Sequence, residues 1–360
     1  METASHLQGK TDGNTPPGSI TAGEIYHQPL LWNDTFTRMR DKSWRGWAEG
    51  SGVLCGAGTS AYAASAIQSA WPASRMVATT DLLTDSRALK HADFLLSIAR
   101  SGDSPESIGA VRLARHEFAA LPQLAITCNA NGQLARDGQI EVLLLDERTN
   151  DRSLVMTSSF SNLVLAGLCL SHREVLQPHL GVICRRVEDQ LPGLEALARV
   201  VASSPPSRAV VLASSPLFPW AQESCLKMLE MSAGRIAAIS ETYLGLRHGP
   251  MSFLDRETLV LCLVSSDPQR QLYEADLLHE LSTKQLGRVI ALMPPGFSGE
   301  GIHNRVVAMV PELPDHLRTP FEIVFPQLLA YHLSLAMGLN PDSPSPCGII
   351  NRVVDGVRLY

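Results

Sequence analysis

Short apolar runs alternate with longer segments of helical periodicity along most of the chain. Runs rich in Val, Ile and Leu predict strands, and in the first half they are residues 53–55, 75–80, 94–99, 123–127 and 141–145. In the second half they are residues 208–213, 235–239, 258–264, 289–292 and 321–325. Helical segments such as 104–119 and 220–233 lie between them. This alternation predicts an α/β fold, with doubly wound, mostly parallel, flavodoxin-like sheets flanked by helices.

The pattern restarts after a polar stretch, residues 203–207, so the sequence predicts two similar units in tandem. We expect a flexible tail over 1–20, a first unit with an N-terminal helix over 21–202, and a second unit with a C-terminal tail over 203–360. The N-terminal helix is predicted to begin at Thr21, with Glu24 completing a capping box. Residues 158–190 are apolar and helical and would connect the units.

Composition narrows the function classes. The chain has 360 residues, 45% hydrophobic and 18% charged, with a net charge of −6, which gives no electrostatic reason to expect nucleic acid. No apolar run reaches the ~18 residues of a membrane span, and no signal peptide stands out. Seven scattered cysteines favour reduced thiols in a cytoplasm. No spacing suggests a metal site, so a cytoplasmic enzyme without metal or redox cofactor is expected.

A glycine-rich turn, Gly56-Ala57-Gly58-Thr59-Ser60, follows the first predicted strand. Glycines let the backbone approach a ligand closely, and the helix start that follows offers free N–H groups and two hydroxyls to an anion such as phosphate. The same turn fits a dinucleotide fingerprint with Asp81 as the ribose-binding acid. A tight turn without any ligand is the third interpretation.

A second turn with clustered hydroxyls follows the third predicted strand, at Arg100-Ser101-Gly102-Asp103-Ser104. Turns after neighbouring parallel strands meet at one edge of the sheet, so both turns could surround one phosphate. Ser158, before the long apolar helix, could complete the shell. Ordinary helix caps would look the same. The phosphate-binding candidates are therefore Gly58, Thr59, Ser60, Arg100, Ser101, Ser104 and Ser158.

Candidate catalytic groups lie in the second unit. Glu223, Lys227 and Glu230 are spaced to share one helix face, where a carboxylate could carry a proton. A solvated ion pair is the simpler alternative. His248, followed by Gly-Pro, lies on a predicted irregular loop, where its imidazole could either reach a ligand or play a structural role.

Taken together and in this order, these motifs resemble the tandem sugar isomerase (SIS) domain family. The resemblance is closest to the AgaS-type galactosamine-6-phosphate deaminase/isomerases, also called tagatose-6-phosphate ketose/aldose isomerases, and extends to the isomerase half of glucosamine-6-phosphate synthase. The segments that carry it are residues 24–29, 56–60, 101–104, 156–159, 226–230, 247–250 and 351–354.

The resemblance implies roles for these residues. Thr59, Ser60, Ser101, Ser104 and Ser158 would match phosphate-binding positions. Glu230 would move the proton between C1 and C2 of the sugar, close to Lys227. His248 would assist ring opening from a neighbouring subunit, which implies a homodimer or larger assembly. Arg352 stands where the synthase has a lysine, a change that keeps the charge but alters the chemistry.

The implied substrate is a hexosamine 6-phosphate, and the implied reaction converts galactosamine 6-phosphate to tagatose 6-phosphate and ammonia. The alternatives are an isomerase that releases no ammonia, a glucosamine-6-phosphate deaminase, a non-catalytic phosphosugar sensor, and the dinucleotide-dependent oxidoreductase. The glutamine amidotransferase half of the synthase has no counterpart in the sequence.

Overall fold

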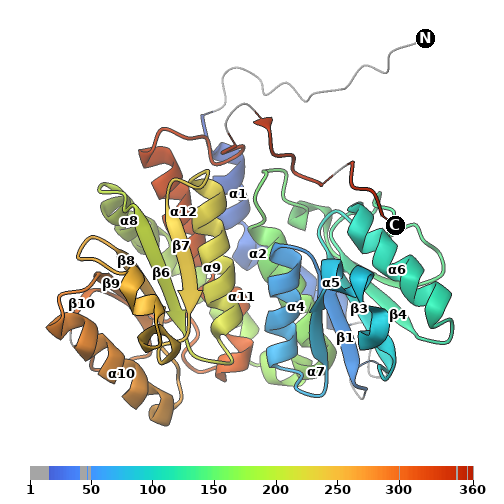
Figure 1. The fold of residues 1–360 in the computed structure, drawn as a ribbon, viewed down its shortest axis with the longest axis horizontal. Helices are drawn as coiled ribbons and strands as arrows, with labels where there is room; N and C mark the ends of the chain where they lie inside the picture. The colour runs from blue at the N-terminus through green and yellow to red at the C-terminus, as the bar shows by residue number, and fades with distance from the viewer. Residues whose placement is uncertain are drawn as a thin grey trace.

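The protein was analysed as a computed structural model that describes residues 16–40, 47, 50–299, 301–345, 348–354 and 356–359. Two five-stranded sheets, parallel in every pairing, stand on either side of a central group of helices (Figure 1). The first sheet has the order β2-β1-β3-β4-β5 and the second β10-β9-β8-β6-β7. From β7 to β10, the strands of the second sheet have the same order as those of the first sheet from β2 to β5. The prediction of two similar units is therefore confirmed.

The strand bounds follow the apolar runs closely. The first sheet consists of β1 (Gly52–Gly56), β2 (Arg75–Ala78), β3 (Phe94–Ala99), β4 (Gln123–Thr127) and β5 (Glu141–Leu144). The second consists of β6 (Arg208–Ala213), β7 (Ala237–Glu241), β8 (Leu259–Leu263), β9 (Arg288–Met293) and β10 (Ile302–Val307). Every residue of β1, β3 and β8 is buried, as expected for central parallel strands that are covered on both faces.

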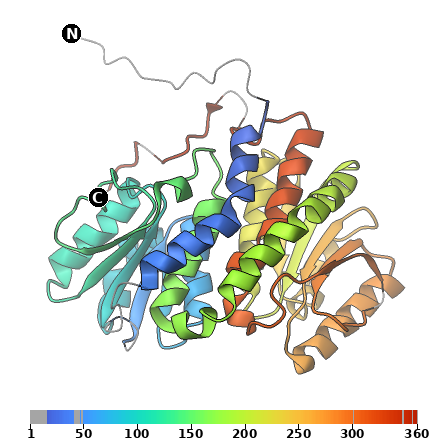
Figure 2. The same cartoon turned by 180° about the vertical axis from the view of Figure 1, so that it is seen from behind.

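Helices fill the space between the sheets and cover their outer faces. They are α1 (Ser19–Tyr26), α2 (Gln28–Arg40), α4 (Thr59–Ser69), α5 (Thr79–Thr84), α6 (Pro105–Glu117), α7 (Ser158–Leu176), α8 (Leu180–Ala202), α9 (Phe218–Met231), α10 (Pro268–Thr283), α11 (Thr319–Glu322) and α12 (Val324–Ala336). From behind, α1, α2, α8 and α12 cross the middle of the molecule (Figure 2). In the part of the chain that the structure describes, no helix is long and apolar enough to cross a membrane.

One apolar core is continuous between the two units. It includes Leu54 and Leu96 of the first sheet and Val211 and Leu261 of the second, all fully buried. Helices α4 and α9, each of which follows the first strand of its unit, pack against one another inside this core. The relative position of the two units is therefore fixed by shared packing.

One predicted strand is wrong, and one strand of the second sheet was not predicted. Residues 321–325 are helical, because an apolar run buried on all sides looks the same in a strand and in a buried helix such as α12. The fifth strand of the second sheet is instead β10, whose sequence Ile-His-Asn-Arg-Val-Val has too few apolar positions to stand out.

The predicted capping box at the N-terminus is also wrong. Helix α1 begins at Ser19, and Thr21 lies inside it, where its hydroxyl donates to Asp342 at 2.8 Å. Glu24 accepts hydrogen bonds from the backbone N–H groups of Arg152 and Ser153 instead. Both side chains therefore tie α1 to distant loops. Most of the predicted tail lies outside the described residues.

Candidate active site

A cavity of about 280 Å³ lies at the carboxyl edge of the first sheet. The turn after β1, the turn after β3 and the loop before α7 form three of its walls. Glu230, on α9 of the second unit, and residues 350–354 of the C-terminal segment complete it. The C-terminal segment runs from α12 across the first unit (Figure 1). Parts of the chain that are far apart in sequence therefore share one cavity.

The turn after β1 depends on its glycines. A Cβ at Gly56 would lie 2.3 Å from the carbonyl oxygen of Ser60, so no side chain fits there. Gly58 has φ +56° and ψ −130°, a conformation that favours glycine, and it caps α4. The start of α4 therefore lies at the cavity edge, where Gly58, Thr59 and Ser60 line it. This geometry suits an anion.

The hydroxyl of Thr59 is engaged elsewhere. It accepts a hydrogen bond from the Lys227 ammonium at 3.0 Å and donates to a Glu223 oxygen at 3.4 Å. This side chain therefore connects α4 of the first unit to α9 of the second. Thr59 therefore lines the cavity as the first residue of α4, while its hydroxyl is hydrogen-bonded to Lys227 and Glu223.

The turn after β3 has the predicted cap. Ser104 accepts a hydrogen bond from the N–H of Ser107 at 3.3 Å, and Pro105 is the first residue of α6. The Ser101 hydroxyl accepts from the N–H of Asp103, also at 3.3 Å. Both serines line the cavity together with Ser60, so the two hydroxyl-bearing turns do meet at one place.

Two arginines hold the C-terminal segment over the cavity. Arg100, 7% exposed, donates to the carbonyl oxygens of Leu154 at 3.3 Å and Arg352 at 2.6 Å. Arg352 donates to the carbonyl oxygen of Asp151 at 2.7 Å and to the Asn150 side chain at 2.6 Å. Burial and the neighbouring Arg352 charge lower the pKa of Arg100 to about 10, so it remains a cation at neutral pH.

Neither guanidinium forms an ion pair with a carboxylate of the described residues; both donate to uncharged carbonyl oxygens. Their positive charge is therefore available to an anion in the cavity, because a neutral partner satisfies the N–H groups without cancelling the charge. Glu106, also on the cavity wall, is the acid that sequence reasoning did not single out.

The candidate base belongs to a buried ion-pair cluster on α9. The Lys227 ammonium lies 2.5 Å from a Glu230 oxygen and 3.2 Å from a Glu223 oxygen. The side chains of Lys227 and Glu223 are fully buried, whereas Glu230 is 30% exposed and reaches the cavity. The simpler alternative of a solvated ion pair is thus wrong.

The protonation states of this cluster differ along the helix. Burial raises the pKa of Glu223 to about 8. Burial also opposes the charge on Lys227, but the two carboxylates outweigh it and raise its pKa. Because Glu230 is the closer partner, we assign the ion pair to Lys227 and Glu230. Lys227 therefore holds the Glu230 carboxylate in place at the cavity.

Comparison with known proteins gives the family. No family model matches the chain. An AgaS protein of Streptomyces coelicolor is 35% identical over 96% of this chain and 98% of its own. The D-galactosamine-6-phosphate deaminase AgaS of Escherichia coli O157:H7 is 34% identical over 95% of this chain and 96% of its own. The chain belongs to the AgaS family.

The fold of this AgaS-family chain agrees with that assignment. The crystal structure of tagatose-6-phosphate ketose/aldose isomerase from Escherichia coli has a TM-score of 0.83 and 31% identity, covering 96% of this chain and 99% of that one. The two units are accordingly tandem SIS domains.

Three residues expected in the AgaS-type site, Lys227, Ser158 and His248, do not line this cavity. Lys227 is buried behind Glu230. Ser158 is fully buried, where its hydroxyl accepts from Asn162 at 3.2 Å. The start of α7 is occupied by the Asp151 carboxylate, which accepts from the N–H groups at 157, 158 and 159. His248 follows the short helical turn Gly245–Arg247, is exposed, and does not line the cavity of its own chain.

Further residues of the site escaped prediction. The cavity wall also includes Leu154 and residue 350, which lie outside the segments that carry the resemblance. Met156 and residues 351, 353 and 354 lie within those segments, but no role in the site was predicted for them. Asp151 lies seven residues before Ser158, the first residue of the helix it caps, which is outside the range of the usual capping rule. Glu223 was recognisable by its spacing from Lys227, but its burial was not.

Proposed function

We propose that the protein is a deaminating aldose–ketose isomerase that converts galactosamine 6-phosphate and water to tagatose 6-phosphate and ammonia. One observation carries the proposal: the Glu230 carboxylate shares a cavity of about 280 Å³ with Ser60, Ser101 and Ser104. The serines can therefore bind the phosphate group at one end of a sugar phosphate while Glu230 accepts a proton at the other end. The names of the AgaS relatives support this substrate.

The first unit is proposed to bind the phosphate. The N-terminus of α4 and the three serine hydroxyls are the donors, and the charges of Arg100 and Arg352 favour a dianion. Binding energy from this remote group orients the reacting carbons, which is how phosphate esters commonly assist catalysis.

Glu230 is proposed to act as the base. It removes the proton from C2 of the open-chain sugar while O1 gains a proton, which gives an enolamine. The same proton is then returned to C1 while the nitrogen loses a proton, so that C1 carries a hydroxyl and C2 a C=N bond. Water then adds to this ketimine, ammonia leaves, and the ketose remains. The Lys227 ammonium, 2.5 Å from a Glu230 oxygen, holds the carboxylate that would act as the base.

The test is Glu230→Gln. Replacing a general base by its amide should slow turnover by about 10²–10⁴-fold. Binding of the sugar phosphate should persist, because the phosphate donors are unchanged. Glu106→Gln is the matched control, since it makes the same change at another residue that lines the cavity.

Ammonia and ketose should be measured separately for each variant. Ammonia release by the wild type, with turnover lost only in Glu230→Gln, would support the proposal. Ketose without ammonia would assign the non-deaminating isomerase, and retained turnover in Glu230→Gln would remove this residue from the mechanism.

We also infer that His248 acts in the site of a partner subunit, so that the enzyme is a homodimer or larger. Its exposure on an irregular loop supports this, because an exposed imidazole can reach a neighbouring chain. A cytoplasmic location fits the six free, buried cysteines of the described residues. The units are proposed to divide at residue 203, where a loop joins α8 to β6.

A further inference from the structure

The duplication gives the second unit its own hydroxyl-bearing corner. By sheet order, β6 corresponds to β1 and β8 to β3. Ser214 follows β6, and Ser265-Ser266-Asp267-Pro268 follows β8 and starts α10. This repeats the first unit, where Ser101 to Ser104 follow β3 and Pro105 starts α6. Serine hydroxyls and a helix start therefore also meet at the carboxyl edge of the second sheet.

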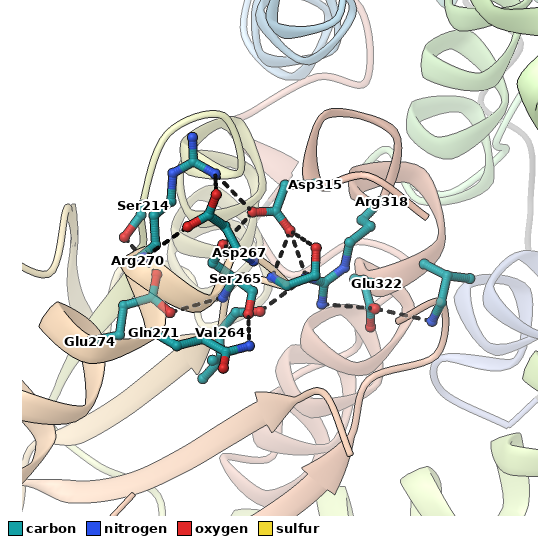
Figure 3. Close-up of polar contacts among 12 residues, drawn as sticks. Ser214, Val264, Ser265, Asp267, Arg270, Gln271, Glu274, Asp315, Arg318 and Glu322 are labelled. Carbon is teal, nitrogen blue, oxygen red and sulfur yellow. Dashed lines mark hydrogen bonds and ion pairs between the residues drawn. The ribbon is translucent and has the colours of Figure 1, made fainter. Parts of the chain in front are cut away.

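A carboxylate of the same chain occupies this second corner. Asp315 accepts hydrogen bonds from the N–H of Ser266 at 2.9 Å, from its hydroxyl at 2.8 Å, and from the hydroxyl of Ser265 (Figure 3). Arg318, fully buried, donates to the same carboxylate at 2.9 Å, and Arg270 lies 3.6 Å from it. The partners of Asp315 are thus hydroxyl, backbone N–H and guanidinium groups, the donors that an oxyanion requires.

We propose that Asp315 is a built-in anion that fills the phosphate-type corner of the second unit. Two consequences follow. Each chain has one free phosphate corner, the one in the first unit, although the fold contains two. Removing the carboxylate should turn the second corner into a site for a small tetrahedral oxyanion such as inorganic phosphate. This inference goes beyond the proposed reaction and does not require it.

The surroundings of the corner support an anion of this kind. The Nη1 group of Arg318 also donates to the carbonyl of Val264 at 3.0 Å, and its Nη2 group donates to Glu322 at 3.3 Å. Its Nε atom has no partner among the described residues. Loss of Asp315 would thus leave a buried guanidinium and the Ser265 and Ser266 donors without their shared acceptor, which is costly in a low dielectric.

Three nearby carboxyl groups share the donors of this corner. Asp267 lies 3.6 Å from Arg270 and caps the start of α10. Glu274 accepts from Ser214 at 2.6 Å and from the N–H of Ser265 at 2.9 Å, and burial raises its pKa to about 7. Glu322 accepts hydrogen bonds from Arg318 and from two backbone N–H groups. Asp315 is 5% exposed and Arg270 is largely exposed, so the corner lies next to solvent and an ion can reach it.

The two units differ in the loop that follows their fifth strand. In the first unit, the loop after β5 places Leu154 and Met156 on the cavity wall and leaves the corner open. In the second, the loop after β10 inserts Asp315 between the serines and Arg318. The loop after the fifth strand thus lines the cavity in the first unit, whereas in the second unit it supplies the carboxylate that fills the corner.

The test compares Asp315→Ala with Asp315→Asn. Both remove the charge from a buried pair, so both should lower the melting temperature by about 5 °C. Only alanine leaves space for an ion. At roughly 50 mM, inorganic phosphate should therefore stabilise Asp315→Ala by at least about 2 °C more than an equal ionic strength of chloride does. The asparagine variant and the wild type should gain only what the first-unit corner contributes.

Equal rescue of all three proteins would overturn the proposal. If Asp315→Ala does not fold, equilibrium dialysis of the wild type with labelled inorganic phosphate decides: one site per chain supports the inference, and two equivalent sites refute it. Neither measurement depends on turnover. A failure of the proposed reaction, seen as an active Glu230→Gln enzyme, would leave these results unchanged.

Discussion

Replacing Lys227 by methionine is the most informative test of how the two units build the site. Its ammonium is fully buried and contacts Glu230 at 2.5 Å, Glu223 at 3.2 Å and the hydroxyl of Thr59 at 3.0 Å. Methionine has a similar length and can fill the same space, so the change removes charge and hydrogen bonds but creates little cavity.

The expected loss of stability follows from what each carboxylate can do afterwards. Removing one partner of a buried ion pair costs about 3–5 kcal/mol, because the other charge stays behind. Glu223 can escape this cost by taking up a proton, since its pKa is already about 8. Glu230 is 30% exposed and can turn toward water. We therefore expect the low end of the range, about 3 kcal/mol at pH 7.

Turnover should fall further than stability suggests. Without Lys227 the Glu230 carboxylate is no longer held against the cavity, and misplacement of a reacting group by about 1 Å can cost about 10²-fold. At about pH 9, above the pKa of Glu223, the double variant Lys227→Met/Glu223→Gln should regain stability, because it removes a buried acid that would otherwise ionise without its partner. It should not regain activity, because Glu230 remains untethered.

Urea unfolding followed by tryptophan fluorescence gives the stability of the wild type, the single variants and the double variant. Ammonia release gives their activity. The expected pattern at about pH 9 is a favourable coupling of at least about 1 kcal/mol between the two substitutions in stability, with no recovery in rate. A Lys227→Met enzyme with wild-type turnover would refute the positioning role, and additive stability effects would refute the ion-pair cluster.

Two further predictions concern pH and subunit assembly. Burial raises the pKa of Glu274 from 4.5 to about 7, so its contribution to stability is complete below pH 4.5 and is lost as the pH rises to 7. Between these pH values the unfolding free energy should fall less steeply in Glu274→Gln than in the wild type, by up to about 1.4 kcal/mol per pH unit. Glu257→Gln, at an exposed position, is the control. An unchanged slope in Glu274→Gln would contradict the assignment. An equimolar mixture of Glu230→Gln and His248→Ala chains should recover about a quarter of wild-type activity if His248 acts across a two-fold interface. In such a mixture half the dimers contain one chain of each kind, and each of these dimers has one intact site out of two. No recovery would place His248 in its own chain's site or outside the mechanism.

The central strands could be predicted from the sequence because they are buried on both faces. Residues 94–99, 123–127 and 208–213 are short runs made mostly of apolar residues, and the structure has strands with these bounds. The edge strand β10 was missed for the opposite reason, since only Val306 of its six residues is buried. The pattern of apolar residues therefore indicates which segments are buried. It identifies a strand only where the strand is itself buried.

The site was predictable where local chain geometry decides it. Ser104 and Pro105 form a cap whose signature is contained in four residues. Ser158 has the same local signature, but Asp151 reaches the start of that helix from an irregular loop and takes its N–H groups. Short-range patterns therefore identify donors, while the choice of acceptor depends on loops whose paths the sequence does not reveal.

The contact between α4 and α9 explains why the site needs both units. Helix α4 begins at the proposed phosphate corner with Thr59, whose hydroxyl accepts a hydrogen bond from Lys227 in the C-terminal half of α9. Lys227 in turn holds Glu230. The distance between the phosphate donors and the base is therefore set by one chain of buried contacts inside the shared core. Because that core is continuous from the first sheet to the second, the two ends of the sugar site cannot move independently without breaking buried ion pairs.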